Sequence, residues 1–169
     1  MKALIISDMQ KIITKHKDFS QTISHIDKIV KEFRDKKDLI VFTKQISHNK
    51  DDFFYLEYET TNIDYQVMAN DIVIEKQSPS AFKDTNLDEV LRKNHIEEVT
   101  LVGFNTEFCC LFTTIAAFDR GYRVTFVEDA IGSCNDENAY EMPGLDINDF
   151  VGTVLDWSSV ISVIYTEEL

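Results

Sequence analysis

Three side chains with acid–base or nucleophilic chemistry, Asp8, Lys76 and Cys109, each follow an apolar segment of the chain. Cys109 lies in the stretch 101–111, Leu-Val-Gly-Phe-Asn-Thr-Glu-Phe-Cys-Cys-Leu, where an apolar run turns at Gly103 and enters a segment with helical periodicity. A thiol in the first turn of a helix meets the positive end of the helix dipole, which favours the reactive thiolate. Free cysteine is also among the most buried residue types, so Cys109 alone is equally consistent with a core residue.

Asp8 and Lys76 lie at equivalent places in the chain, because each comes at the end of a short strand-like run. Residues 3–6 are wholly apolar and lead into Ser7-Asp8, and the run 71–75 leads into Lys76. Each has a common structural alternative, because aspartates cap turns and lysines are usually exposed. Ligands of open parallel sheets bind outside the carboxyl ends of the strands. The shared position therefore predicts that Asp8, Lys76 and Cys109 converge at one edge of a sheet.

The scaffold for these residues is an alternation of strand and helix patterns. Strands are predicted at residues 3–6, 39–43, 71–75, 99–102, 123–127 and 160–165, and helices at 20–36, 87–93, 106–120, 135–142 and 149–157. Such alternation indicates an α/β fold in which helices cover both faces of a parallel sheet. We expect one domain, residues 1–169, with a three-layer α/β/α architecture and a six-stranded, mainly parallel sheet.

The helix that carries the cysteines needs a start and a buried face. Thr106 is a favourable N-cap type, which places Cys109 in the first turn. The apolar stripe of Leu111, Ile115 and Phe118 is expected to face the core. Cys110 should point away from the site, since neighbouring residues of a helix differ by about 100° in direction.

Composition excludes several classes of partner. The chain has 17 Lys and Arg against 30 Asp and Glu, a net charge of −13, and no basic run, which argues against nucleic acids and anionic membrane surfaces. The number of cysteines is odd and their spacing fits no disulfide framework or zinc site, so a reducing cytoplasmic location is expected. No apolar run is long enough for a membrane span or a signal sequence.

The segment 44–70 is the least regular part of the chain. Its aromatic residues alternate with acidic ones and could line a pocket, cover a subunit interface or pack under a loop. His48 stands near Asp51 and Asp52, but one histidine beside two loop carboxylates is more often solvated surface than a metal site.

Three sequence blocks carry a resemblance to a known family. They are Leu-Ile-Ile-Ser-Asp-Met-Gln at 4–10, Lys-Gln-Ser-Pro-Ser-Ala-Phe at 76–82, and Gly-Phe-Asn-Thr-Glu-Phe-Cys at 103–109. In order and spacing they are similar to motifs of the isochorismatase-like cysteine hydrolases, which include nicotinamidases and N-carbamoylsarcosine amidase. The matching blocks lie between residue 3 and about residue 130, and 44–70 matches poorly. The resemblance implies an isochorismatase-like, Rossmann-like fold.

The same resemblance implies an Asp–Lys–Cys triad of Asp8, Lys76 and Cys109. In such a triad the cysteine attacks an amide, ureide or carbamoyl carbon of a small molecule and forms a thioester acyl-enzyme. The aspartate takes the thiol proton and passes it to the leaving amine. The lysine keeps the aspartate ionised and favours the thiolate.

Further features follow from the resemblance alone. The Phe104–Asn105 peptide bond is expected to be cis, with the backbone N–H groups of Asn105 and Cys109 forming an oxyanion hole. Gln10 and Phe82 are expected to contact the substrate. No cofactor is implied, and the protein is expected to form a homo-oligomer, either a dimer or a tetramer.

The stretch 43–48, Thr-Lys-Gln-Ile-Ser-His, departs from the metal-binding Asp-x-His of nicotinamidases. A bound metal and nicotinamidase activity are therefore not expected. Two other functions stay open: a non-catalytic or oligomeric binding protein on the same fold, and an isochorismatase-type vinyl-ether hydrolase, whose reaction does not need the cysteine.

Overall fold

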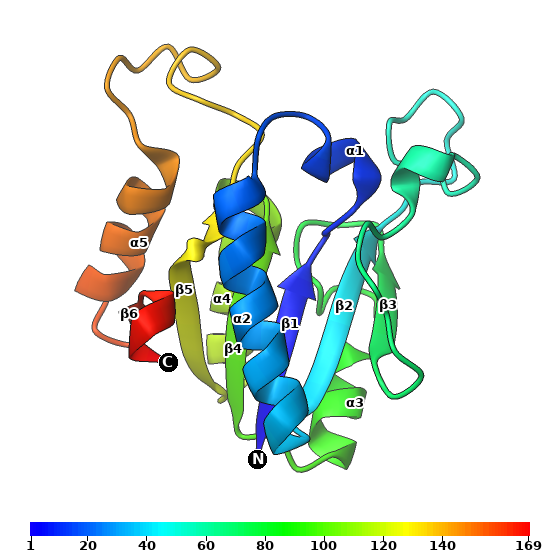
Figure 1. Ribbon diagram of the computed structural model, residues 1–169, viewed down its shortest axis with the longest axis vertical. Coiled ribbons are helices and arrows are strands. Elements are labelled where there is room, and N and C mark those ends of the chain that lie inside the picture. Colours follow the sequence, from blue (N-terminus) through cyan, green and yellow to red (C-terminus); the bar gives the residue numbers. More distant parts are fainter.

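The computed structural model describes residues 1–169 as a three-layer α/β/α domain (Figure 1). Its six strands follow the order β3-β2-β1-β4-β5-β6, and every neighbouring pair is parallel. The strands are β1 (Lys2–Ser7), β2 (Leu39–Gln45), β3 (Ile72–Lys76), β4 (Glu98–Phe104), β5 (Arg123–Gly132) and β6 (Ser162–Ile164). The predicted six-stranded α/β architecture is confirmed.

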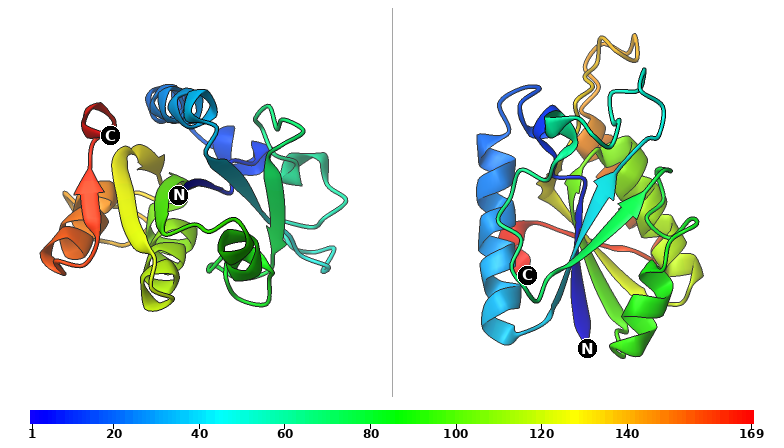
Figure 2. Two further views of the ribbon diagram at one scale, coloured as in Figure 1. Left: turned by 90° about the horizontal axis from the view of Figure 1, so that it is seen from below. Right: turned by 90° about the vertical axis from the view of Figure 1, so that its right-hand side faces the viewer.

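The helices cover both faces of the sheet (Figure 2). They are α1 (Lys11–Thr14), α2 (Ser20–Lys36), α3 (Leu87–Lys93), α4 (Leu111–Asp119) and α5 (Ile147–Trp157), with 3₁₀ turns at Glu59–Thr61 and Thr166–Glu168. Helix α2 lies on one face, and α3, α4 and α5 lie on the other. A turn of π-helix, Thr106–Cys110, leads into α4. No helix has the length and apolar character needed to cross a membrane.

The hydrophobic core is divided by the sheet into two clusters. One lies between the sheet and α3–α5 and includes Ile5 and Leu101, and the other lies under α2 and includes Ile6 and Phe104. β1 is central in the sheet, and Ala3–Ile6 are fully buried. A strand buried on both faces must be apolar at every position, which explains its unbroken apolar sequence.

Several predicted boundaries are wrong. Lys76 is the last residue of β3 rather than the first residue after it, and β5 continues to Gly132, so Glu128 and Asp129 lie inside the strand. Residues 135–142 form turns, not a helix. The Asp136 side chain accepts hydrogen bonds from the backbone N–H groups of two following residues, and this local bonding competes with helix formation.

The predicted core stripe of α4 is also wrong. Ile115 and Phe118 are 46% and 40% exposed, and Leu111 is only partly buried. The face of α4 that meets the sheet is formed by short side chains, among them Thr113 and Ala117. Short side chains let the helix pack closely on the sheet, whereas apolar periodicity does not distinguish an inward face from an outward one.

Candidate active site

Asp8 is the first residue after β1 and lies at the carboxyl edge of the sheet. Its backbone has a positive φ of 43°, and its side chain is fully buried. The Thr43 hydroxyl, near the end of the neighbouring strand β2, donates to Asp8 Oδ1 at 2.6 Å and accepts from the Asp8 N–H at 3.1 Å. Thr43 therefore fixes both the backbone and one carboxylate oxygen of Asp8.

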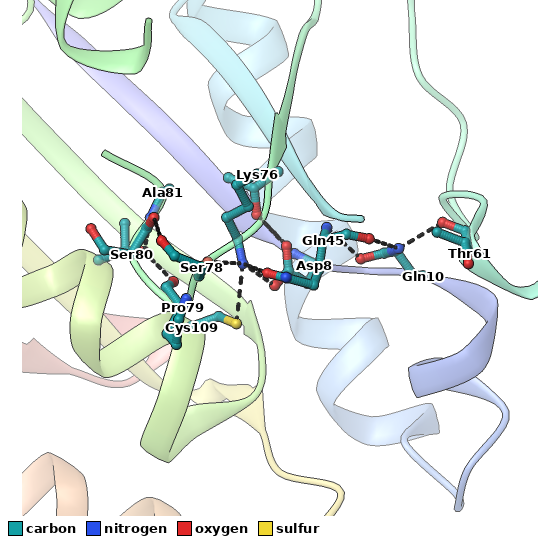
Figure 3. A network of polar contacts seen from close by, with 12 residues as sticks. Asp8, Gln10, Gln45, Thr61, Lys76, Ser78, Pro79, Ser80, Ala81 and Cys109 are labelled. Atoms are coloured by element: carbon teal, nitrogen blue, oxygen red, sulfur yellow. Dashed lines mark hydrogen bonds and ion pairs between the residues drawn. The ribbon is translucent and has the colours of Figure 1, made fainter. Parts of the chain in front are cut away.

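Lys76 brings its ammonium group to the other oxygen of the same carboxylate (Figure 3). Lys76 Nζ lies 2.7 Å from Asp8 Oδ2 and donates to Gln45 Oε1 at 2.7 Å and to the Ser78 carbonyl at 3.1 Å. The side chain is almost completely buried. Burial works to lower the pKa of Lys76, but the charge of the Asp8 carboxylate, reinforced by Cys109 whenever its thiol is ionised, outweighs burial, so the pKa is raised and the ammonium stays charged.

Cys109 lies in the π-helical turn, with Sγ 3.2 Å from Lys76 Nζ. Burial, reinforced by the Asp8 carboxylate, raises the pKa of Cys109 to about 12, although Lys76 acts in the opposite direction. The thiol therefore keeps its proton at neutral pH in the free protein. The sequence predicts that the helix start and Lys76 stabilise the Cys109 thiolate. In the structure, the loss of hydration on burial has the larger effect on the pKa and favours the protonated thiol.

Cys110 points elsewhere, as predicted. It is fully buried in the cluster between the sheet and α3–α5, and burial raises its pKa well above the ordinary value. Cys110 is therefore a core residue, whereas its neighbour Cys109 is partly exposed to solvent.

The start of the cysteine helix differs from the prediction that Thr106 is the N-cap. The cap position is Asn105, and Thr106 Oγ1 donates instead to Asn148 Oδ1 of α5 at 2.5 Å. The Asn105 carbonyl accepts from the Cys110 N–H at 3.1 Å, and the Asn105 side chain accepts from the Cys134 N–H at 2.8 Å. The Phe104–Asn105 peptide bond is cis.

Gln10 and Phe82, expected as substrate contacts, both belong to the scaffold. The fully buried amide of Gln10 donates to the Gln45 and Thr61 carbonyls at 2.9 and 2.6 Å and accepts from the Gln45 N–H at 2.8 Å (Figure 3). Phe82 is buried and stacks against Tyr122. Neither side chain presents a free surface to a ligand.

Gln45 and Thr43 were not identified as site residues from the sequence. Gln45 is the last residue of β2 and Thr43 lies two residues before it, and both bond directly to the Asp8–Lys76 pair. Both residues belong to the stretch 43–48, which the sequence analysis considers only as a place where the metal-binding motif is missing. Polar residues at the end of a buried strand indicate the same site without reference to any metal.

Glu107, two residues before Cys109, holds the segment that follows β5. Its Oε1 accepts from Ser133 Oγ and Asn135 Nδ2, both at 2.8 Å, and from the Tyr140 hydroxyl at 3.0 Å. A polar cavity of about 480 Å³ lies beside this segment and is lined by parts of residues 17–22, 132–137 and 144–148. It includes none of the three reactive residues.

No group of three or more His, Cys, Asp or Glu side chains is arranged to hold a metal ion. The oxygen atoms around Lys76 Nζ belong to a carboxylate, a side-chain amide and a backbone carbonyl, and a metal would need the same atoms as ligands. These groups are already bonded to the ammonium, so they form a site for Lys76 itself.

Comparison with known proteins assigns the family. The isochorismatase domain profile matches residues 2–159. Nicotinamidase 3 of Arabidopsis thaliana is 42% identical over 72 residues, which are 43% of this chain and 36% of that protein. The isochorismatase family protein YrdC of Bacillus subtilis is 30% identical over 135 residues, which are 76% of this chain and 72% of that protein.

Solved structures agree on the fold. A cysteine hydrolase from Pseudomonas syringae pv. phaseolicola superposes with a TM-score of 0.85 at 19% identity, covering 99% of this chain and 89% of that one. The nicotinamidase PncA of Bacillus subtilis has a TM-score of 0.80 at 21% identity, covering 96% and 98%. The sequence match to the Arabidopsis nicotinamidase, in contrast, spans little more than a third of that protein.

Proposed function

Because the chain belongs to the isochorismatase family of hydrolases, we propose that it hydrolyses a C–N bond of a small amide, ureide or carbamoyl compound with Cys109 as the nucleophile. One observation carries the proposal. Lys76 Nζ lies within 3.2 Å of both Asp8 Oδ2 and Cys109 Sγ, although the three residues come from three separate parts of the chain.

The first half of the reaction forms the acyl-enzyme. Because the resting thiol is protonated, Asp8 takes its proton as Sγ attacks the substrate carbon. Lys76 stays charged and stabilises the carboxylate before the transfer and the thiolate during it. The backbone N–H groups of Asn105 and Cys109 are the expected donors to the developing oxyanion, and such a donor contributes about 3–4 kcal/mol to the rate.

The second half returns the enzyme to its starting state. The C–N bond breaks, and Asp8 gives the proton to the leaving nitrogen, which leaves a thioester on Cys109. Water then attacks the thioester carbon while Asp8 takes a proton from it. The C–S bond breaks, the acid product leaves, and the proton returns to the sulfur.

The role assigned to Lys76 makes a metal unnecessary for this reaction. The stretch 43–48 lacks the metal-binding Asp-x-His that the resemblance gives to nicotinamidases, and its Gln45 amide oxygen accepts a hydrogen bond from Lys76. We therefore expect hydrolysis without a bound metal and on substrates other than nicotinamide.

Adjacent cysteines supply the test. A screen of amides, ureides and carbamoyl compounds, read by ammonia release, identifies a substrate. Cys109→Ala and Cys109→Ser should then be inactive, because alanine has no nucleophile and a serine hydroxyl is far harder to ionise. Cys110→Ala should keep most activity and lose at most some stability from a trimmed core side chain.

The outcomes separate the alternatives. Activity that survives in Cys109→Ala and disappears in Cys110→Ala would overturn the proposed nucleophile. Hydrolysis that survives in both variants, or cleavage of a vinyl ether with no C–N activity, would show that the protein is not a cysteine amidohydrolase.

A further inference from the structure

Glu107 belongs to the π-helical turn Thr106–Cys110, here called the Cys109 turn, and lies midway between the two expected oxyanion donors, Asn105 and Cys109. Successive residues of a helix are rotated by about 100°, so Glu107 points to nearly the opposite side of the turn from Cys109. Its hydrogen-bond partners all belong to the segment after β5, which rises above the sheet on its way to α5 (Figure 1). Glu107 therefore supports the turn from the side opposite to the reactive thiol.

One oxygen of Glu107 accepts all of these hydrogen bonds. Ser133 Oγ, Asn135 Nδ2 and the Tyr140 hydroxyl each donate to Oε1. The Ser133 hydroxyl also accepts from the Asn135 N–H at 3.0 Å, which closes a ring of contacts. Hydrogen bonds to an ionised acceptor are roughly twice as strong as neutral ones, so a carboxylate holds this segment more firmly than an amide would.

Asn105 binds the same segment at the residue in between. Its side-chain oxygen accepts from the Cys134 N–H at 2.8 Å. Backbone pairing of β4 with β5 reaches the last residue of each strand. Beyond that point the side chains of Asn105 and Glu107 continue the connection, because together they bond residues 133, 134 and 135. The Cys109 turn is therefore attached to the end of β5 by side chains alone.

This attachment affects the site through the backbone of Asn105. The Asn105 N–H donates to no other group of the chain, whereas its carbonyl accepts from the Phe108 and Cys110 N–H groups at 3.2 and 3.1 Å. A free N–H in the segment of the nucleophile is what an oxyanion hole requires, and the donor must be placed to within about 0.5 Å. The groups that fix this backbone therefore decide whether the donor is aimed correctly.

We propose that Glu107 is a positioning residue: by binding the segment after β5, it holds the Cys109 turn so that the Asn105 and Cys109 N–H groups point at the developing oxyanion. This role rests on the proposed function, since it assumes that a tetrahedral oxyanion forms on Cys109. Glu107 makes no hydrogen bond to the thiol or to the Asp8–Lys76 pair, so it should act on the oxyanion alone. A misplacement of about 1 Å can lower a rate on the order of a hundredfold.

The test compares two reagents for the Cys109 thiol. Iodoacetamide is attacked at its CH₂ group and loses iodide, so no oxyanion forms. Propanal adds to the thiol: the S–C bond forms, the thiol proton passes to the carbonyl oxygen, and the hemithioacetal places that oxygen where the oxyanion would lie. The propanal concentration that halves the rate of iodoacetamide labelling, followed by peptide mass spectrometry, measures the stability of the adduct.

Glu107→Ala should raise that propanal concentration about ten- to a hundredfold. The labelling rate without propanal should change less than about twofold, since burial, Asp8 and Lys76 set the pKa of the thiol. On any substrate found by ammonia release, kcat should fall by a similar factor with little change in KM, because the lost contact acts only in the transition state.

Three further variants control for folding and for charge. Glu107→Gln should give an intermediate loss, because an amide oxygen accepts the same hydrogen bonds without the charge. Tyr140→Phe removes one of the three donors at an exposed position, so it should weaken the adduct about three- to tenfold and leave the circular dichroism spectrum unchanged. Glu141→Gln, at an exposed carboxylate of the same segment, should have no effect.

The outcomes separate this role from the proposed function. Propanal that gives no protection to the wild-type thiol would contradict the oxyanion hole and the hydrolase together. Equal protection in the wild type and in Glu107→Ala would overturn the role of Glu107 and leave Cys109 as the nucleophile. The role is also overturned if Glu107→Ala slows iodoacetamide labelling as much as it weakens the adduct, or if Glu141→Gln has the same effect.

Discussion

A β-carbon on Gly103 would lie 2.2 Å from the carbonyl oxygen of Ser7. The two residues pair at the carboxyl ends of β4 and β1, and Gly103 has a φ of +111°. Asp8 directly follows Ser7, and the turn that holds Cys109 comes shortly after Gly103. The absence of a side chain at Gly103 therefore lets two strands of the site end side by side.

Gly103→Ala should destabilise the protein by more than about 3 kcal/mol, because it combines a backbone clash with a strained φ. Gly121→Ala is the matched control, since Gly121 also has a positive φ of +89° but nothing lies within 4 Å of the added carbon. It should lose only about 1–2 kcal/mol. Urea unfolding measures both. Equal losses would mean that the contact with Ser7 relaxes at little cost.

Alkylation of Cys109 should become steadily faster with pH well beyond the range of an ordinary thiol. The pKa of Cys109 is raised from 9.0 to about 12, so the thiolate fraction still grows tenfold per pH unit near pH 10. A thiol with the ordinary pKa of 9.0 stops gaining thiolate about three pH units lower. Iodoacetamide labelling with peptide mass spectrometry resolves Cys109 from Cys134. A plateau below pH 9 would contradict the protonated resting state.

Asp8→Asn should separate reactivity from turnover. The Asp8 carboxylate raises the pKa of Cys109, so its removal should make alkylation at pH 8 several-fold faster. Hydrolysis should nevertheless be lost, because no base remains to carry the proton to the leaving nitrogen. Lys76→Met should slow alkylation, since Lys76 lowers the same pKa. Faster hydrolysis in Asp8→Asn would contradict the assigned role.

Gln45→Leu should lower kcat by about ten- to a hundredfold with little change in KM. Lys76 Nζ would lose one hydrogen bond acceptor inside a buried site, and an unsatisfied buried donor costs about 1–3 kcal/mol. Gln45→Asn tests the geometry, because it keeps the amide but shortens its reach. Gln77→Leu, at an exposed neighbour of Lys76, should have no effect. A change confined to KM would assign Gln45 to the substrate instead.

The sequence predicted the sheet and the positions of the reactive residues well, for a local reason. Buried parallel strands are short apolar runs, and the residue after such a run lies at the sheet edge wherever the strand pairs. Asp8, Lys76 and Cys109 could be brought to one edge on that basis alone. Their mutual distances depend on pairing between segments far apart in the chain, which no local pattern contains.

The incorrect predictions have one cause: each depended on which of several possible packing or hydrogen-bonding partners a residue would meet in the folded protein. The periodicity of Leu111, Ile115 and Phe118 was real, but the pattern does not say which apolar face meets the sheet. Residues 135–142 have helical spacing, yet Asp136 and Glu107 provide alternative hydrogen bonds for that segment. The hydrogen bonds of Gln10 likewise required knowing that Gln45 and Thr61 would be its neighbours.

Among the strands of the sheet, β1 comes first in the chain, and it lies in the middle of the sheet. One of its edges pairs with β2, from residue 39 onward, but its other edge pairs with β4, which begins at Glu98. During translation, the fully apolar Ala3–Ile6 therefore keeps one unpaired edge until β4, about 90 residues further along the chain, has also been made. Unpaired apolar edges promote association between nascent chains. From the central position of β1 we therefore expect the yield of folded protein to depend on chaperones and on the rate of synthesis.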